Sequence, residues 1–408
     1  MNLDRRTLLK LGAASAAGLA LPFNAFAQGN ELLLGALTPI TGAGSPYGPG
    51  MLKAMEIAVK EVNDAGGAAG RMFKLISEDS QTQPQSAVLA AKKLIEINKV
   101  QAILGTWASG VTLAVMPLTD AANIIEMTTS GAPAISTLNK KGLVWRFQAT
   151  DGHFGRAFAK IAEKRGFKRP AAMAFDNAAG RGITDGFIKT WEADGHGKVL
   201  TSVVYEPGRP SYQSELQQVL ATNPDVIVMG SYLPDTTIIL REWYQIGHNN
   251  AWIIPAWAAN HDLVKALGND ATNGIIAVDT VSNVDADSYK NLSSRYQKAT
   301  GHPLSDNVYA VMAYDMVISL ALAAQKAGAN ASPRAIDDQI RAVANPPGQK
   351  VYSFAQGKKL LEAGQKINYE GASSRLDFDK YGNSDLDFGV YVIKNGKFDL
   401  VDTISLDK

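Results

Sequence analysis

The 408-residue sequence contains no cysteine, and this absence excludes several kinds of function at once. Without a thiol the chain has no cysteine nucleophile, no thiolate metal site and no disulfide to stabilise it. Its five histidines are scattered, and no two of them have the spacing of metal ligands on one helix. The sequence therefore predicts no metal site and no cofactor, and a fold that depends on its hydrophobic core.

The chain also lacks an excess of charge and the common catalytic motifs. Forty basic and 39 acidic residues leave a net charge of +1, so neither a nucleic acid nor a membrane surface is an expected partner. There is no Gly-x-Ser-x-Gly elbow, no phosphate-binding loop with its lysine, and no nucleophile–base pair at a recognisable spacing. Asp79 and Asp315 are interpreted as local hydrogen-bond anchors. We predict that the protein is not an enzyme, and keep an exported α/β enzyme as an alternative.

The first 27 residues have the pattern of an export signal. The pair Arg5-Arg6 precedes a short apolar run from Leu11 to Leu21, and Ala25-Phe26-Ala27 offers small residues for cleavage. The pair resembles the twin-arginine export motif, from which Asp4 and Leu8 depart. The run is shorter than the ~20 residues that span a bilayer, so a cleaved signal is favoured over a membrane anchor. No later apolar run is expected to reach that length, so the mature chain is predicted to be soluble.

From residue 30 onward, short apolar strands alternate with helical segments. Glu31–Leu37 and Met72–Glu78 are predicted strands, and the helix Gly50–Ala65 between them has one apolar face. A second series begins after Val144–Phe147 and continues to the predicted strand Trp252–Pro255. Repeated βα units predict parallel sheets covered by helices on both faces. Two such series in about 380 residues predict an α/β fold with two doubly wound lobes.

The last third of the chain has a different pattern. Helices are predicted over residues 286–300, 308–327 and 333–343, and a polar, glycine-rich region without predicted elements follows them. Near the end, Phe388–Ile393 and Lys397–Val401 alternate in polarity around Asn395-Gly396. Asn-Gly is a strong signal for a tight turn, so these residues predict a β-hairpin.

Ligands in open parallel sheets bind beyond the carboxyl ends of the strands, so the loops at these ends are the candidate site. In the first series these loops offer Ser109 and the run Thr129, Ser130 and Gly131. Hydroxyls and free backbone N–H groups near a helix start suit a carboxylate. The alternative is that Ser109 and Thr129 or Ser130 only cap helices.

Large aromatic residues occur in the same loops of both series. Tyr47 and Trp107 lie in the first, and Tyr232 and Trp257 in the second. Aromatic rings provide a large contact area with polar tips, which suits the walls of a binding cleft. The alternative for Trp107 and Trp257 is ordinary packing between the lobes.

At these loops the chain resembles a known family, the branched-chain amino-acid (Leu/Ile/Val-binding) type of substrate-binding protein of ABC transporters, with the type I periplasmic binding fold. The stretches that carry the resemblance are Gly35–Gly42, Tyr47-Gly48, Ala54–Gly67, Ser109-Gly110, Asn177–Gly182 and Gly230–Asp235. The resemblance implies a periplasmic, monomeric binding protein that closes its lobes on a small ligand and delivers it to a membrane permease. A ligand-sensing protein that signals to another partner is the alternative.

The resemblance also implies the division of the chain. The first lobe is expected to hold residues 29–148 and 281–344, and the second residues 149–280 and 345–408. Three hinge segments would join the lobes, near residues 147–150, 279–281 and 345–348. Residues 1–27 are the signal.

Roles follow from the resemblance residue by residue. Tyr47 matches an aromatic wall of the first lobe, Ser109 and the run 129–131 match positions that hold a carboxylate, and Tyr232 matches a second-lobe aromatic. Asn177 lies in the matching loop, where Ala179 replaces a tyrosine that is frequent in amino-acid binders.

A second mismatch concerns charge. The segment 255–258 has no carboxylate to pair with a ligand ammonium, and a buried ammonium without a partner is strongly unfavourable. We therefore expect a ligand with a carboxylate or amide but no α-ammonium. Because Ala179 leaves space and Trp107 and Trp257 offer ring contacts, an aromatic acid is the specific hypothesis. A branched-chain or other amino acid is the alternative.

Overall fold

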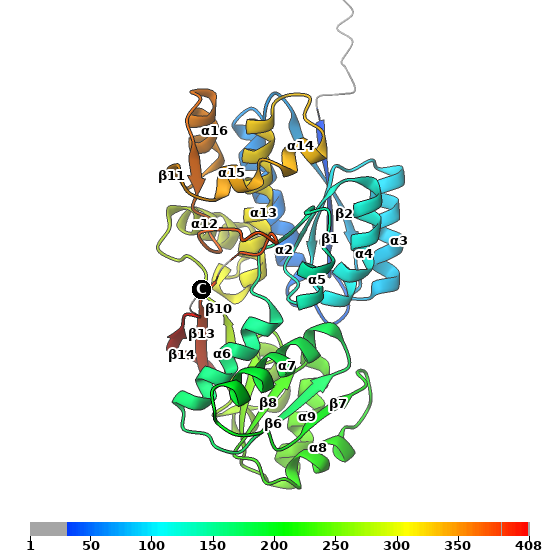
Figure 1. The fold of residues 1–408 in the computed structure, drawn as a ribbon, viewed down its shortest axis with the longest axis vertical. Coiled ribbons are helices and arrows are strands. Elements are labelled where there is room, and N and C mark those ends of the chain that lie inside the picture. Colours follow the sequence, from blue (N-terminus) through cyan, green and yellow to red (C-terminus); the bar gives the residue numbers. More distant parts are fainter. Residues whose placement is uncertain (1–30, 385, 407–408) are drawn as a thin grey trace, which may run out of the picture.

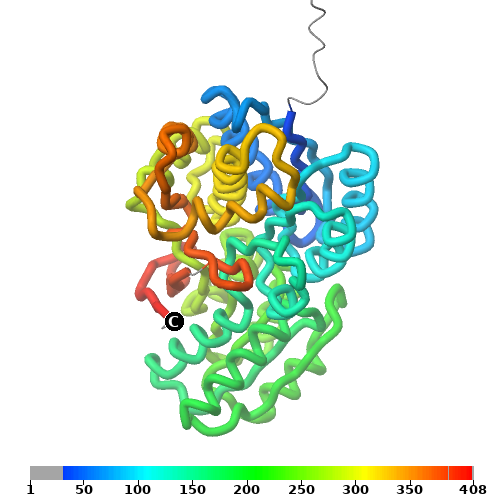
Figure 2. The backbone as a smooth tube through the Cα atoms, turned by 45° about the horizontal axis from the view of Figure 1, so that its top comes forward, coloured from blue at the N-terminus to red at the C-terminus, as the bar shows by residue number. Residues whose placement is uncertain are grey.

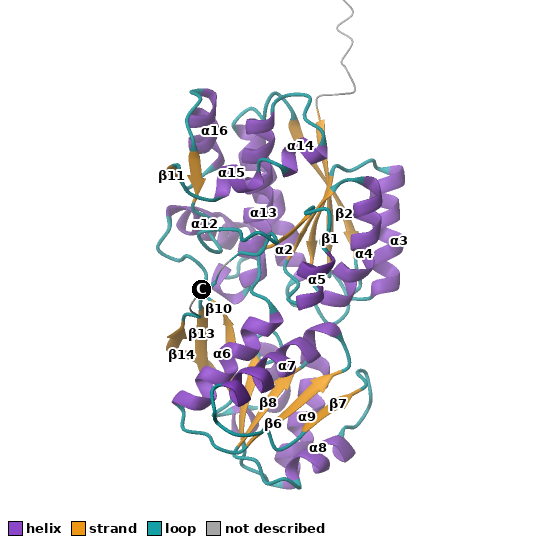
Figure 3. Ribbon diagram, in the orientation of Figure 1, coloured by secondary structure: helices purple, strands orange, loops and turns teal. Residues whose placement is uncertain are grey.

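The computed structural model describes residues 31–384 and 386–406, which form two α/β lobes stacked along the long axis of the molecule (Figure 1). The predicted export signal lies outside the described residues. In both lobes helices flank a central sheet (Figure 3), and the predicted α/β fold with parallel sheets is confirmed.

The first lobe is built on five parallel strands in the order β2-β1-β3-β4-β5. Strands β3 and β4 are buried along their whole length, as expected for parallel strands covered on both faces. The strands are β1 (Glu31–Thr38), β2 (Met72–Asp79), β3 (Ala102–Thr106), β4 (Ile125–Thr128) and β5 (Val144–Arg146). The helices of this part are α2 (Gly48–Asp64), α3 (Pro84–Lys92) with the π-turn Lys93–Ile97, α4 (Ser109–Ala122) and α5 (Pro133–Leu138).

Helix α2 shows how the local sequence sets an element. Its buried residues are those of the predicted apolar face: Met51, Ala54, Met55, Ala58 and Val62, together with Gly48. After α2 the chain turns at Gly66 and Gly67, whose φ angles of 80° and 70° favour glycine. The N–H of Gly67 donates to the carbonyl of Val62 at 2.9 Å, which satisfies one of the last helical carbonyls.

A later part of the chain completes the first lobe. It contributes α12 (Asp287–Thr300), the 3-10 turn Leu304–Asp306, α13 (Val308–Ala327), α14 (Pro333–Asp337) and α15 (Ile340–Ala344). By length and composition α13 is apolar enough to cross a membrane, which the sequence analysis did not expect. It packs against α2, and 89% of its apolar window is buried inside the protein, so α13 is a core helix.

The second lobe holds a seven-stranded sheet in the order β14-β13-β10-β9-β8-β6-β7. The five strands that come from the second βα series are parallel to one another. They are β6 (Pro170–Phe175), β7 (Ser202–Tyr205), β8 (Val226–Gly230), β9 (Ala251–Pro255) and β10 (Ile276–Thr280). The helices are α6 (Asp151–Lys164), α7 (Ala178–Ala193), α8 (Gln213–Leu220), α9 (Leu233–Ile246), α10 (His261–Leu267) and α11 (Asn269–Thr272).

The predicted hairpin completes this sheet. Strands β13 (Phe388–Lys394) and β14 (Lys397–Ile404) are antiparallel, and β13 pairs with β10. The turn residues Asn395 and Gly396 have φ angles of 49° and 76°, which is the conformation that this dipeptide favours.

The structure differs from the expected assignment of residues 345–408 to the second lobe. The glycine-rich region contains β11 (Gln349–Val351), α16 (Phe354–Glu362) and β12 (Ile367–Tyr369), and α16 packs against α13 and α2 of the first lobe. Figure 2 shows this orange segment with the upper lobe. Of the elements described after residue 345, only the hairpin joins the sheet of the second lobe.

Asp315 is the physical reason for this difference. Its buried carboxylate, in the middle of α13, accepts hydrogen bonds from the hydroxyl of Tyr369 at 2.7 Å and the N–H of Ala372 at 2.9 Å. Both the N–H and the hydroxyl of Ser373 donate to it at 2.6 Å. These four bonds hold the segment after β12 on the first lobe, so Asp315 is a hydrogen-bond anchor between distant segments rather than the local anchor that the sequence predicted.

The third connection between the lobes therefore lies later than expected. The N–H of Arg146 in β5 donates to the carbonyl of Gly382 at 2.7 Å, and the N–H of Ser384 donates to the carbonyl of Arg146 at 3.0 Å. The chain still lies beside the first sheet at these residues. It enters the second sheet at Phe388, rather than near residues 345–348.

Candidate functional site

A cavity lies between the lobes, beyond the carboxyl ends of strands from both sheets. Its volume is only about 20 Å³, little more than the space of one water molecule, so the two lobes leave almost no free space between the side chains that line it. Seven of the ten predicted site residues line it: Trp107, Ser109, Thr129, Gly131, Ala179, Tyr232 and Trp257. Three residues that the sequence analysis did not select complete the lining: Gln148, Asp151 and Tyr309.

The first lobe supplies a polar edge. The hydroxyl of Ser109 accepts a hydrogen bond from the N–H of Ala132 at 3.1 Å, which ties the start of α4 to the loop after β4. The N–H of Gly131 has no acceptor among the described residues. Neither α4 nor α5 has a side-chain cap, so the alternative that these hydroxyl residues only cap the two helices is wrong.

Ser130 faces away from the cavity. Its hydroxyl donates to the carbonyl of Trp107 at 2.9 Å and lies 2.6 Å from the hydroxyl of Thr112. The structure therefore places Ser130 in the frame beneath the loop, where it holds the backbone that carries Thr129 and Gly131.

Aromatic rings from both lobes form the walls. The rings of Trp107 and Tyr232 lie 5.1 Å apart across the cleft, and Tyr309 meets Trp107 edge-on at 5.7 Å. Trp257 donates from its indole nitrogen to the carbonyl of Ser231 at 3.1 Å. Trp107 and Trp257 line the cavity, and Trp107 also packs between the lobes, so the two interpretations of Trp107 hold together.

Two further predicted residues support these walls from behind. Tyr47 stacks on Trp107 with ring centres 5.8 Å apart and is not part of the cavity lining. Asn177 caps α7 by accepting from the N–H of Gly180 at 2.8 Å, and its side chain also bonds the hydroxyl of Tyr232.

Of the three lining residues that the sequence did not predict, Asp151 matters most for the chemistry of the cavity. It is the first residue of α6, directly after the first connection between the lobes, and its side chain is buried. Its Oδ2 atom has no hydrogen-bond partner among the described residues. The sequence signal was weak because Asp151 follows a connection, whereas the loops considered follow strands of the βα series.

Burial sets the protonation of Asp151. It raises the pKa of this carboxyl to about 8, although the charge of Arg146 and a hydrogen bond from Ser109 act in the opposite direction. Arg146 donates to the carbonyls of Gly131 at 2.7 Å and Ala132 at 3.1 Å, and burial lowers its pKa to about 10. Asp151 is the only acidic residue in the described lining of the cavity, and its raised pKa favours the protonated form.

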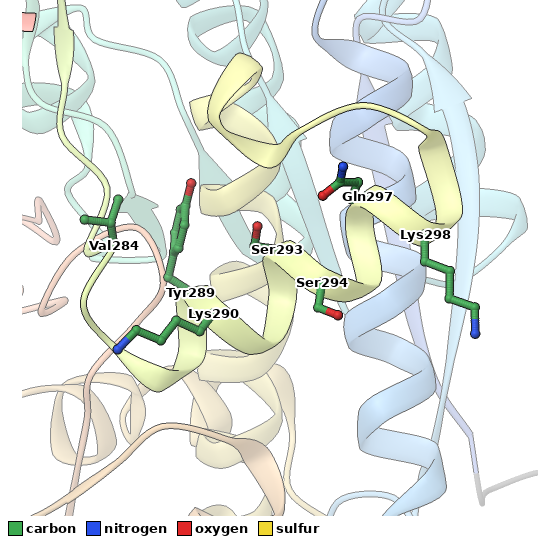
Figure 4. Close-up of a pocket in the computed structure, with 7 residues that line it drawn as sticks. All are labelled: Val284, Tyr289, Lys290, Ser293, Ser294, Gln297 and Lys298. Atoms are coloured by element: carbon green, nitrogen blue, oxygen red, sulfur yellow. The ribbon is translucent and has the colours of Figure 1, made fainter.

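A larger hollow of about 600 Å³ lies elsewhere on the first lobe, along α12 (Figure 4). Its lining comes from this helix and the segment before it: Val284, Tyr289, Lys290, Ser293, Ser294, Gln297 and Lys298. None of these residues comes from a second element, so the side chains do not converge on a ligand as those of the interlobe cavity do. Over residues 31–384 and 386–406, no group of three or more histidine, aspartate or glutamate side chains is arranged to hold a metal ion.

Two α/β lobes with a cavity between the ends of their strands define a protein that encloses a small molecule between its lobes. The family model described as periplasmic binding protein matches residues 31–360, and the chain belongs to this family. The predicted resemblance to the branched-chain amino-acid type, with its type I fold, is confirmed. At this level the chain is a periplasmic solute-binding protein of ABC transport.

Relatives and solved structures support this placement. The Leu/Ile/Val-binding protein BraC3 of Rhizobium johnstonii is 27% identical over 85% of this chain and 90% of its own length. The leucine-binding protein LivK of Thermotoga maritima superposes with a TM-score of 0.77 at 22% identity, over 92% of this chain and 99% of that one. A solute-binding protein from R. palustris, in complex with benzoate, superposes with a TM-score of 0.73 at 21% identity, over 92% and 98%.

Family membership also bears on the predicted permease partner and on the prediction that the protein is not an enzyme. Proteins of this family bind small ligands and work with ABC transporter permeases, and the relatives are substrate-binding proteins rather than enzymes. The structural likenesses, all below 25% identity, show the fold alone.

Proposed function

We propose that this protein binds a small aromatic carboxylic acid between its lobes and delivers it to an ABC permease. The observation that carries the proposal is the composition of the cavity. It has one polar edge from the first lobe and aromatic side chains from both lobes.

The polar edge suits a carboxylate. The N–H of Gly131 is available, and Ser109 begins α4, where unpaired N–H groups and the helix dipole favour an anion. The positive charge of Arg146 lies behind the carbonyls of the same loop. A carboxylate here would gain hydrogen bonds without displacing any that the protein already makes.

The aromatic walls suit a ring. Trp107, Tyr232, Trp257 and Tyr309 surround the space, and Ala179 leaves room where a larger side chain would fill it. Offset and edge-to-face contacts between such rings contribute about 0.5–1.5 kcal/mol per pair beyond area burial. Benzoate in the R. palustris neighbour supports the proposal by analogy of fold.

Asp151 changes the argument against an amino acid. The absence of a carboxylate in residues 255–258 does not leave the cavity without an acid, because Asp151 lies in its wall. Since its pKa is raised to about 8, we propose that Asp151 is protonated at neutral pH and donates a hydrogen bond to the ligand. An amino acid is the second candidate, because the unpartnered Oδ2 atom would accept from an ammonium if Asp151 ionised.

The remaining features of the proposal concern export and movement. The twin-arginine-type segment at residues 1–27 would direct the folded chain to the periplasm, where it would act as a monomer. The lobes would close about the three connections, so that second-lobe contacts form only around bound ligand.

Titration calorimetry tests the ligand class. Benzoate, 4-hydroxybenzoate and hydroxycinnamates should bind, and leucine and valine should not. The isosteric change Asp151→Asn should leave the affinity for an acid within about threefold, because the amide still donates. The same change should weaken an amino acid by at least about tenfold through loss of its charge partner.

The pH profile gives a second, independent reading. Affinity for an acid should fall above about pH 8 as Asp151 ionises and repels the ligand, and Asp151→Asn should abolish this fall. Asp287→Asn is the matched control, because Asp287 also begins a helix, α12, but is exposed. Tight leucine binding without any response to the acids would reject the aromatic-acid proposal.

A further inference from the structure

Asn260 makes a polar contact between the lobes that does not involve the cavity. It is the N-cap of α10 in the second lobe, and its Oδ1 atom accepts from the N–H groups of Asp262 at 3.0 Å and Leu263 at 3.2 Å. This capping orients the amide, so that Nδ2 points across the interface and donates to the hydroxyl of Tyr47 at 3.0 Å. One side chain therefore caps its own helix and contacts the opposite lobe.

Tyr47 is held in place from the first lobe by a second asparagine. Asn307 caps α13 by accepting from the N–H of Ala310 at 3.0 Å, and its Nδ2 atom donates to the carbonyl of Tyr47 at 3.0 Å. The ring of Tyr47 meets that of Tyr309 edge-on at 5.0 Å and stacks on Trp107. The hydroxyl of Tyr47 is thus a fixed acceptor on the first lobe, and only Asn260 must approach it.

The position of this contact separates it from ligand binding. Neither Tyr47 nor Asn260 lines the interlobe cavity, and both line a neighbouring groove of about 650 Å³. Neither residue belongs to the three connections between the lobes. Because the hydrogen bond exists only when α10 meets the start of α2, it favours the closed arrangement whether or not a ligand is present.

We propose that Asn260 is a positioning residue that stabilises lobe closure through the hydroxyl of Tyr47, independently of the ligand. A single net hydrogen bond changes an equilibrium by a factor of roughly five. The pair would therefore set the closed fraction of the ligand-free protein. The proposal does not rest on the identity of the ligand.

The experiment measures closure directly in the mature chain without ligand. Because the sequence has no cysteine, the changes Lys265→Cys in α10 and Lys298→Cys in α12 give two unique exposed sites for spin labels, one on each lobe. Pulsed electron resonance then reports the populations of short and long distances between the labels. No ligand has to be identified first.

Matched variants separate the contact from the stability of the helix. Asn260→Ser keeps an N-cap but does not carry an amide to Tyr47, whereas Asn260→Asp keeps the cap and accepts from the tyrosine hydroxyl. Tyr47→Phe removes only that hydroxyl. We expect the ratio of closed to open molecules to fall roughly fivefold in Asn260→Ser and in Tyr47→Phe, with no further fall in the double variant, and to keep its wild-type value in Asn260→Asp.

Three results would overturn the proposal: no closed population in the ligand-free wild type, an unchanged population in Asn260→Ser, or independent losses that add in the double variant. Thermal melting of each variant shows whether α10 and the fold remain intact. Failure of the aromatic-acid assignment would leave these populations unchanged, so the two proposals fail separately.

Discussion

The two walls of the cleft rest on different physical supports. Beneath the first-lobe wall lies a network of buried hydroxyl groups centred on Thr112. Its Oγ1 atom lies 2.9 Å from that of Thr106, 3.0 Å from that of Thr128 and 2.6 Å from the hydroxyl of Ser130. Such bonds are directional, and a satisfied buried network fixes the backbone above it.

Beneath the second-lobe wall lies a cluster of rings. Trp257 meets Phe154 edge-on at 4.9 Å, and Phe154 meets Phe388 in the same way at 4.8 Å. Tyr232 packs against Phe175 at 4.6 Å. Ring contacts tolerate small displacements better than hydrogen bonds do, so this wall can adjust to the shape of a ligand.

The difference teaches which wall sets which property. The first-lobe wall presents polar groups in fixed positions, so changes there should affect whether the ligand head binds at all. The second-lobe wall covers the rest of the ligand, so changes there should affect the tolerance for size and shape. The predictions below test this division.

Gly131→Ala should have the largest effect. An added Cβ would lie 2.0 Å from Oδ1 of Asp151, so the polar edge and Asp151 cannot both keep their positions. We expect the affinity for the tightest ligand of the acid panel to fall by roughly 30- to 1,000-fold, because overpacking typically costs 1–3 kcal/mol and the displaced N–H adds about 1 kcal/mol. Calorimetry measures the change.

Gly110→Ala is its control, in the first turn of the neighbouring helix α4. There the added Cβ meets only Cγ of Pro84 at 3.4 Å, an ordinary contact, so binding should remain at the wild-type level. Wild-type affinity in Gly131→Ala would show that the loop after β4 does not form the polar edge.

Trp107→Ala should have the next largest effect, because Trp107 is the first-lobe ring that meets the second-lobe wall. Loss of a buried aromatic contact of about 1.5–3 kcal/mol predicts affinity weaker by roughly ten- to a hundredfold, with the fold retained. Trp243→Ala is the matched control. Trp243 packs against Trp252 in the second lobe, outside the cavity lining, so its loss should lower the melting temperature without changing affinity.

The sequence was most informative where local chemistry decides the structure. Alternating apolar segments predicted the parallel sheets, and Asn395-Gly396 predicted the hairpin because its φ angles depend on these two residues alone. The rule that ligands bind beyond strand ends selected loops that do meet in one cavity.

What the sequence could not show depends on contacts between distant residues. Asp151 counts as a cavity residue only because folding buries its carboxyl and brings Gly131 beside it. The segment after β12 stays on the first lobe because it donates to Asp315, more than 50 positions earlier in the chain. Neither of these two contacts between distant residues produces a periodic or local pattern in the sequence.

Glu126→Gln tests the frame of the first-lobe wall. Glu126 is buried in β4, accepts from the hydroxyl of Thr119 at 2.9 Å, and lies 3.3 Å from the hydroxyl of Thr106. Burial raises the pKa of Glu126 to about 8, so protonation favours the folded state. This contribution is fully present below the unfolded pKa of about 4.3 and is lost as the pH rises through 8.

The wild-type melting temperature should therefore fall between pH 6 and pH 9, and Glu126→Gln should reduce this fall by about 2–4 °C. Glu362→Gln, at the exposed end of α16, makes the same chemical change and should reproduce the wild-type profile. Identical pH profiles of the melting temperature for the wild type and both variants would show that the pKa of Glu126 is not raised in the folded protein.

Ser109→Ala should have the smallest effect. It tests whether the polar edge of the first-lobe wall and the frame beneath it contribute separately to binding. Removing its hydroxyl leaves the N–H of Ala132 without an acceptor and takes one donor from Asp151, so we expect affinity to weaken about fivefold, near 1 kcal/mol. Ser130→Ala is the comparison. Its hydroxyl bonds the carbonyl of Trp107 and the frame beneath the loop, so its loss should lower the melting temperature and leave affinity within about twofold. If both variants weakened binding equally, a change in the frame would also displace the polar edge. The frame and the polar edge would then not have separate roles in binding.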